Sequence, residues 1–199
     1  MADPNGQHSA AAGGVREEGA PGRLDVVRRF VNTEDVEDDI EELGTPAAMR
    51  AWLREQGLPD VRGAGAADLE RLTGLRTALR QLLLANNGQP HDERALERLR
   101  TEAAHVDLRV DFPAGDASVL LPAGTGMDAV VAELVGIVHE AMADGTWTRL
   151  KACRSETCEW AFYDRSRNRS GTWCSMAVCG NREKARAHRR RHAAGNSAT

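Results

Sequence analysis

The chain has 199 residues, a net charge of −4 and only 4% aromatic residues, so its core must be mostly aliphatic. No segment approaches the run of about 20 apolar residues that a membrane helix needs, and the first residues lack the basic and apolar regions of a secretory signal. These features argue against a membrane-spanning or secreted protein, and we expect a cytoplasmic one.

Charge is distributed unevenly along the chain. Residues 149–192 contain twelve Lys or Arg and four acids, a net charge of +8, whereas the remainder of the chain carries −12. Such a division predicts an acidic body followed by a basic segment that faces a polyanion. The alternative is an ordinary solvated charged surface.

The two ends of the chain have few large apolar side chains. Residues 1–23 cannot bury enough surface to offset the entropy of ordering, so they are expected to form a disordered leader. Residues 193–199 are expected to form a disordered tail for the same reason.

Residues 24–146 have the pattern of a mostly helical domain. The apolar side chains within 24–32 have helical spacing, although the valines leave a strand open. The acidic run over 34–42 predicts a loop or a weak helix. A helix is predicted from Thr45, the N-cap, to Gly57, the stop. Further along, the patterns predict a leucine-striped helix over 66–88, a helix over 92–105, a β-hairpin over 106–123 and a buried apolar helix over 126–145.

All four cysteines lie in the basic segment, with the spacing C-x4-C-x15-C-x4-C. Two cysteine pairs on either side of a hairpin-sized loop can close a tetrahedral Zn²⁺ site. Disulfides are the alternative, but they rarely persist in a reducing compartment. Four sulfur ligands leave no open position for water, so the zinc is expected to be structural. The predicted ligands are Cys153, Cys158, Cys174 and Cys179.

These patterns together predict an α+β fold. A helical body with one β-hairpin would occupy residues 24–146, and a small treble-clef or ribbon-like zinc module would occupy residues 147–192. Strong helix formers follow Cys179 directly, so the last zinc ligand is expected at the N-terminus of a basic helix.

Two parts of the sequence resemble known families. The stretch "WAFYDRSRNRSGTWCSMAVCGNREKARAHRRR" looks like the CGNR zinc finger, named after the tetrapeptide found here at residues 179–182. "FVNT" at residues 30–33 and "ELGTPAAMRAWLREQGL" resemble the ABATE domain, which usually precedes that finger in bacterial proteins. The resemblance covers about residues 24–192 and implies a stress-induced transcription regulator, with RNA binding also suggested for the family.

The basic segment has the composition of a nucleic-acid-binding surface. Its arginines fall on one predicted helical face and in a loop where they alternate with Ser and Asn, so they can neutralise phosphates. DNA is favoured over RNA as the partner. In the alternative interpretation, the basic module docks onto the acidic body, within one chain or across a homodimer. The predicted phosphate-binding residues are Arg165, Arg167, Arg169, Arg182, Arg186, Arg189 and Arg190.

The body lacks the spacing of a P-loop, a dinucleotide fingerprint, a nucleophile elbow or a zinc-protease helix. His139 is its most suggestive residue, because Ala129, Ala132 and Gly136 precede it along one side of the apolar helix and could border a cavity. We therefore expect a body that senses a small apolar ligand, joined to a DNA-binding finger. The alternative is a ligand-binding or biosynthetic enzyme that keeps the finger as a structural element.

Overall fold

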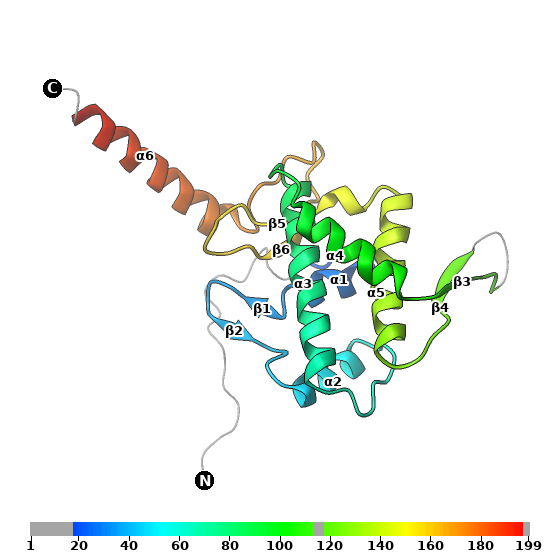
Figure 1. Ribbon diagram of the computed structural model, residues 1–199. Coiled ribbons are helices and arrows are strands. Elements are labelled where there is room, and N and C mark those ends of the chain that lie inside the picture. The colour runs from blue at the N-terminus through cyan, green and yellow to red at the C-terminus, as the bar shows by residue number, and fades with distance from the viewer. Residues whose placement is uncertain (1–17, 114–117, 197–199) are drawn as a thin grey trace, which may run out of the picture.

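The computed structural model describes residues 18–113 and 118–196 and confirms the α+β class. Figure 1 shows a helical body with small hairpins at its edges and one long helix that projects from it. The two-stranded sheets of the described residues are all antiparallel hairpins. In chain order the elements are α1 (Leu24–Val31), β1 (Glu34–Asp35), β2 (Ile40–Glu41), α2 (Pro46–Glu55), α3 (Ala66–Asn86), α4 (Glu93–Ala104), β3 (Leu108–Asp111), β4 (Val119–Pro122), α5 (Gly126–Ala143), η1 (Trp147–Arg149), β5 (Leu150–Ala152), β6 (Ala161–Tyr163), η2 (Met176–Gly180) and α6 (Asn181–Asn196).

Local capping chemistry explains where the body helices begin. The Ala48 N–H donates to the Thr45 hydroxyl at the start of α2 (3.1 Å), as predicted. The Asp92 carboxylate accepts two backbone N–H groups at the start of α4. Gly57 follows α2 with a φ of +68°, a conformation that glycine adopts without steric cost. The predicted helices over 45–57, 66–88 and 92–105 are confirmed.

The hydrophobic core lies between α1, α3 and α5. The leucine stripe of α3 is almost fully buried, and α5 buries side chains around most of its circumference, as expected for a central helix. The same core continues past residue 146, because Trp147, Leu150, Ala152 and Ala161 are buried in one cluster with the body's apolar side chains. The expected boundary between body and finger therefore runs through a shared core.

The acidic segment 34–42 forms a hairpin, β1–β2, instead of the expected loop or weak helix. Its register pairs Glu34 with Glu41, and Asp39 adopts a left-handed φ of 53° in the turn. Two arginines of α3 fix it: Arg76 binds Glu41 through both carboxylate oxygens, and Arg80 binds Glu34. Propensity favoured no strand here, so contacts with a distant helix decide the conformation.

The predicted β-hairpin over 106–123 is confirmed as β3–β4, and it packs against α5. At Gly136 the chains approach so closely that a Cβ would lie 3.6 Å from Leu108 and 3.8 Å from Leu120. At Gly136 the small-residue stripe therefore accommodates a hairpin, whereas Ala129 of the same stripe lines a cavity of about 540 Å³. His139 lies on the exposed side of α5, and its place in a ligand pocket stays a prediction.

The ends of the chain differ from the expectation where they can be compared. Residues 1–17 of the expected leader and 197–199 of the expected tail lie outside the described residues. Within the leader, the Ala20 N–H donates to the Asp25 carboxylate (2.8 Å) and Ala20 is buried. At the other end, α6 continues to Asn196, into the segment expected to be a tail. No helix in the described part of the chain is both long enough and apolar enough to span a membrane.

Candidate metal centre and basic helix

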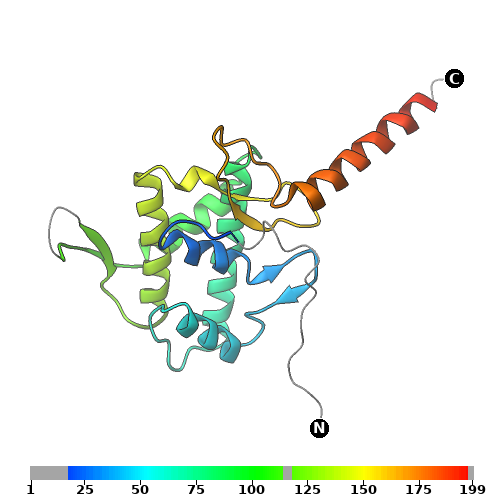
Figure 2. The same ribbon diagram turned by 180° about the vertical axis from the view of Figure 1, so that it is seen from behind.

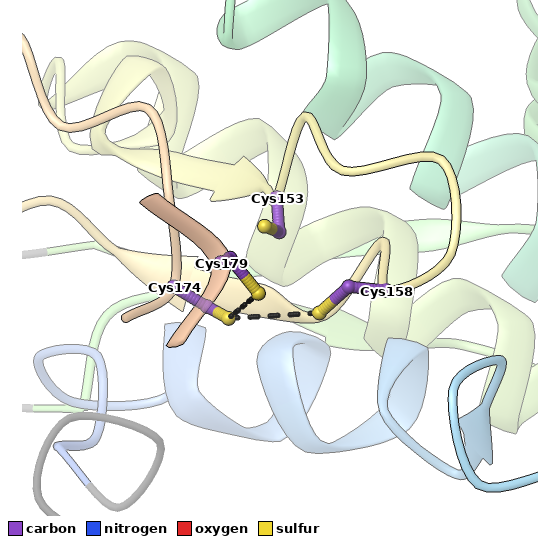
Figure 3. A group of neighbouring side chains, drawn as sticks. All are labelled: Cys153, Cys158, Cys174 and Cys179. Carbon is purple, nitrogen blue, oxygen red and sulfur yellow. Dashed lines mark hydrogen bonds between the residues drawn. The ribbon is translucent and has the colours of Figure 1, made fainter. Parts of the chain in front are cut away.

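The four cysteines converge on one point, as Figure 3 shows. Cys153 follows β5, Cys158 lies in the turn before β6, Cys174 ends the long loop, and Cys179 belongs to the single helical turn η2. Their sulfur atoms all lie within 4.8 Å of one another, and none of the four side chains is more than 1% exposed. The two cysteine pairs of the sequence thus form one buried cluster.

The distances within this cluster fit a tetrahedral metal. A Zn–S bond of about 2.3 Å in a regular tetrahedron places neighbouring sulfurs roughly 3.8 Å apart. The Cys158–Cys174 and Cys174–Cys179 sulfur distances are 3.6 and 3.7 Å, and all four cysteines are free. A disulfide needs about 2.05 Å, so the structure does not contain one here.

The electrostatics of the cluster also indicate a cation. Burial, followed by the charges of the neighbouring Cys153 and Cys158 sulfurs, raises the pKa of Cys179 to about 12. The pKa of Cys174 is also raised, and the largest cause is its hydrogen bonding with the Cys153 and Cys158 sulfurs. Four thiolates at this spacing repel one another unless a metal cation lies between them. The donor set therefore fits a metal ion and would hold one through four sulfurs.

Three asparagines of the body hold the first hairpin of this module. The Asn32 side chain donates to the Ala161 carbonyl (2.9 Å) and accepts from the Ala161 N–H (2.7 Å), and all of these groups are buried. Asn86 donates to the carbonyls of Trp147 and Leu150, both at 2.9 Å. Asn87 donates to the Ala152 carbonyl, directly before Cys153 (2.7 Å), and to the Thr172 carbonyl in the loop after β6 (2.8 Å). The metal cluster is thereby fixed to the body.

The tetrapeptide at 179–182 connects the cluster to α6. A Cβ at Gly180 would overlap the Met176 sulfur and lie 3.1 Å from the Trp173 ring, so only glycine fits without rearrangement. The Asn181 side chain donates to the Ala177 carbonyl (3.1 Å), which connects the first residue of α6 to η2. Arg182 reaches back to the body and binds Glu37 of the acidic hairpin (2.5 Å).

Helix α6 leaves the module and points away from the body in both views of the molecule (Figures 1 and 2). Its first turns have a half-buried face that carries Arg182 and Arg186, and each of these arginines is bound to a carboxylate. Lys184, Arg189 and Arg190 are exposed, but Lys184 lies about 140° around the helix axis from Arg189, so these cations do not share one face. Two arginines of the predicted face are therefore already paired with carboxylates, and Lys184 is an exposed cation that arginine spacing alone does not indicate.

The other three predicted arginines lie in the exposed loop after β6. A buried ion pair positions this loop: Lys151 donates to the Asp164 carboxylate (2.7 Å) and to the Arg169 and Gly171 carbonyls. Burial by itself raises the pKa of Asp164, but hydrogen bonds from Lys151, Ser166 and Gly171 outweigh it and hold the pKa at about 2. Figure 1 shows that the loop and α6 leave the module in different directions. The seven arginines therefore form two groups.

Within the loop, Arg165 and Arg169 already have partners. The Arg165 guanidinium lies over the Tyr163 ring, 5.5 Å from its centroid, and donates to the Gly19 carbonyl (2.6 Å). Arg169 donates to the Thr148 hydroxyl at 3.4 Å. Arg167 is exposed, with no hydrogen bond or ion pair to any other described residue. Of the loop arginines, Arg167 is the one whose side chain is most available to a phosphate.

The arrangement defines a class: a helical body fused through a shared core to a four-cysteine module that presents a basic helix. Comparison with protein families agrees with it. Residues 24–144 match the ABATE model, described as "Putative stress-induced transcription regulator", and residues 149–192 match the CGNR zinc finger. The chain belongs to the ABATE family and carries a CGNR zinc finger. A search of the curated proteins found no match.

Proposed function

We propose that this member of the ABATE family regulates transcription by binding DNA through α6, with a structural zinc ion in the four-cysteine cluster. The observation that carries the proposal is the geometry of α6. Sixteen residues project from the body as a helix, and its side chains Lys184, Arg189 and Arg190 are exposed. A helix of this length spans about 24 Å.

DNA is the better partner for a helix presented in this way. The major groove of B-DNA, about 12 Å wide, admits an α-helix, whereas the major groove of an RNA duplex is too deep and narrow. The exposed cations along the helix would contact phosphates and release counterions, which makes binding dependent on salt. The free Arg167 side chain could add a phosphate contact from the loop.

Zinc is the metal that the donor set favours. Four thiolates in a closed tetrahedral arrangement are typical of structural zinc sites. Four cysteine ligands would leave no open coordination position for a water or a substrate. When bound, zinc supplies the positive charge that lets four thiolates lie together. Cys179 then fixes the end of η2, and Gly180 leads directly into α6, whose first residue is Asn181.

Elemental analysis and native mass spectrometry test the metal. We expect about one zinc per chain, lost in Cys174→Ser and retained in Ser170→Ala, an exposed control in the same module. A metal-free protein with four reduced cysteines, or with disulfides, would contradict the assignment.

Fluorescence anisotropy with duplex DNA, single-stranded DNA and duplex RNA tests the nucleic-acid partner. The double variant Lys184→Glu, Arg189→Glu should weaken binding to duplex DNA and reduce the slope of log K against log salt by about 2, because each phosphate contact contributes roughly 0.9. The matched control is Arg54→Glu, Arg62→Glu, which makes the same charge change at exposed positions of the body. Equal effects of both variants would show a general charge effect and remove α6 from the interface.

One specific contact favours a second role for the basic module. Arg182 binds Glu37, so the module docks on the acidic hairpin of its own body, as the alternative interpretation of the sequence requires. Docking uses Arg182 in the first turn of α6 and leaves the exposed cations Lys184, Arg189 and Arg190 available, so the two roles are compatible. Absence of binding to all three nucleic acids at low salt would leave docking as the remaining role.

A further inference from the structure

A cavity of about 270 Å³ lies where α1, α2 and the zinc module meet. Its walls include two tryptophans, Trp52 from α2 and Trp160 from the turn that follows Cys158. Its other lining residues are polar or charged, so the cavity differs from the apolar pocket that the sequence suggested. The volume is below the range of about 300–1,000 Å³ that is usual for drug-sized ligands, which indicates a small metabolite.

Arg28 gives the strongest sign of a missing partner in this cavity. The residue is only 7% exposed, and its Nε donates to the Asp25 carboxylate (2.6 Å). Its two terminal nitrogens have no hydrogen-bond partner among the described residues, although Arg28 lines the cavity. These nitrogens are not buried away from solvent, so they are accessible at the cavity wall, and their planar pair of N–H groups matches a carboxylate. Arg28 and Arg29 share the single charge of Asp25, which leaves one positive charge at this wall.

Carboxylates border the same cavity. Glu42 precedes α2, Glu55 is its last residue, and no described residue forms an ion pair with either side chain. Partial burial raises the pKa of Glu42, and the neighbouring Glu55 carboxylate raises it further. Two carboxylates that repel each other in this way gain stability when a cation binds between them. An ammonium group there could also contact the face of a tryptophan ring.

The arginines and the glutamates do not neutralise each other. No ion pair joins Arg28 or Arg29 to Glu42 or Glu55 within residues 18–113 and 118–196. The cavity therefore keeps a separated positive wall and negative wall, with two indole rings for the rest of the ligand. From this arrangement we infer that the cavity binds a small zwitterion of the α-amino-acid class, its carboxylate on Arg28 and its ammonium group on Glu42 and Glu55.

The position of the cavity links such a ligand to the zinc module. Trp160 directly precedes Ala161, the residue that Asn32 holds through two hydrogen bonds, and Asn32 itself lines the cavity. The Trp160 carbonyl accepts from the Cys153 N–H (3.0 Å). A bound amino acid would therefore contact both the body and the chain between two cysteines. This inference stands whether or not α6 binds DNA.

The test uses the full-length, zinc-loaded protein and the twenty amino acids, each added separately at millimolar concentration. Thermal unfolding identifies those that stabilise the protein, and titration calorimetry then measures their affinity. For each amino acid that binds, the analogue without the amino group and the analogue without the carboxyl group are titrated as well. We expect at least one amino acid to bind, and both analogues to bind at least about tenfold more weakly, because each loses one charged contact.

Two variants and one control connect binding to the cavity. Glu55→Gln changes an exposed side chain and should weaken binding about fivefold, and Arg28→Lys keeps the charge but loses the two-pronged donor, which should weaken it about tenfold. Glu70→Gln makes the same chemical change as Glu55→Gln at an exposed position of α3 and should bind like the unaltered protein.

Unfolding of each variant without ligand shows whether it is folded, and Glu55→Gln keeps the test valid if Arg28→Lys is not. No stabilisation by any of the twenty amino acids would overturn the proposal. Unchanged affinity in the folded cavity variants would overturn it as well.

Discussion

Replacing Asn32 with alanine tests how the body holds the zinc module. In the structure this one side chain satisfies both backbone polar groups of Ala161, at 2.9 and 2.7 Å. Asn32 is 7% exposed and Ala161 is fully buried. The substitution therefore removes two hydrogen bonds and leaves a buried N–H and a buried C=O without partners.

The expected loss of stability follows from those two groups. An unsatisfied buried polar group costs about 1–3 kcal/mol. Asn32 lines a cavity, so water could reach part of the site in the variant, and we place the total loss at about 2–4 kcal/mol. For a chain of this size that loss lowers the melting temperature by about 5–15 °C.

Urea unfolding and thermal unfolding of the zinc-loaded protein measure this loss. Asn168→Ala, at an exposed asparagine of the loop after β6, is the matched control and should change stability by less than about 0.5 kcal/mol. Because Cys153 and Cys158 lie in the loop that joins the two strands of the hairpin that Asn32 holds, a chelator should also remove zinc faster from Asn32→Ala. A variant as stable as the control, with unchanged zinc release, would refute this account of how the body holds the zinc module.

Three further predictions concern charges and close packing near the site. Glu37→Gln removes the ion pair with Arg182 and should tighten binding to duplex DNA about two- to fivefold at low salt. Asp38→Asn makes the same charge change at the next residue and should tighten binding less. Equal affinities of the two variants in fluorescence anisotropy would contradict this prediction. Asp164→Asn should cost roughly 2.5 kcal/mol in urea unfolding. The folded pKa of Asp164 is lowered from 3.8 to about 2, so the stability that its charge contributes is present above pH 3.8 and lost as the pH falls through about 2. The cost of Asp164→Asn should therefore stay constant between about pH 6 and 8. A cost that varies in this range would be inconsistent with the lowered pKa. Gly171→Ala places a Cβ 2.8 Å from that carboxylate and should cost about 1–3 kcal/mol, and an unchanged unfolding midpoint would show that the loop can shift freely.

Much of the local structure could be predicted because its causes are close in sequence. Thr45 caps the helix that begins at the next residue, and Asp92 does the same for α4. The leucines of α3 repeat at helical spacing, and burial of that stripe follows from its period. The cysteine spacing likewise predicted one four-sulfur cluster, since two pairs around a hairpin-sized loop bring four thiols together in any compact arrangement.

The acidic hairpin could not be predicted from its own residues. Its strands are two residues long, and its side chains have low strand propensity. The buried guanidinium groups of Arg76 and Arg80 lie more than thirty residues away in the sequence and bind its carboxylates. The one indication in the sequence was the pair of arginines on the buried side of α3. A buried arginine requires a carboxylate partner, which the acidic segment supplies.

The sequence by itself determined the helices, the cysteine cluster and the concentration of positive charge at the end of the chain. Tertiary structure alone decided how those charges are used. Helical spacing made the four arginines at positions 182, 186, 189 and 190 equivalent. In the structure Arg182 and Arg186 are half-buried and have carboxylate partners, whereas Arg189 and Arg190 are exposed, as is Lys184. It also decided that His139 faces outward and that body and finger share one core. The physical reason is the range of the interactions: caps and helical periods act within a few residues, but ion pairs and buried contacts depend on which distant segments the fold brings together.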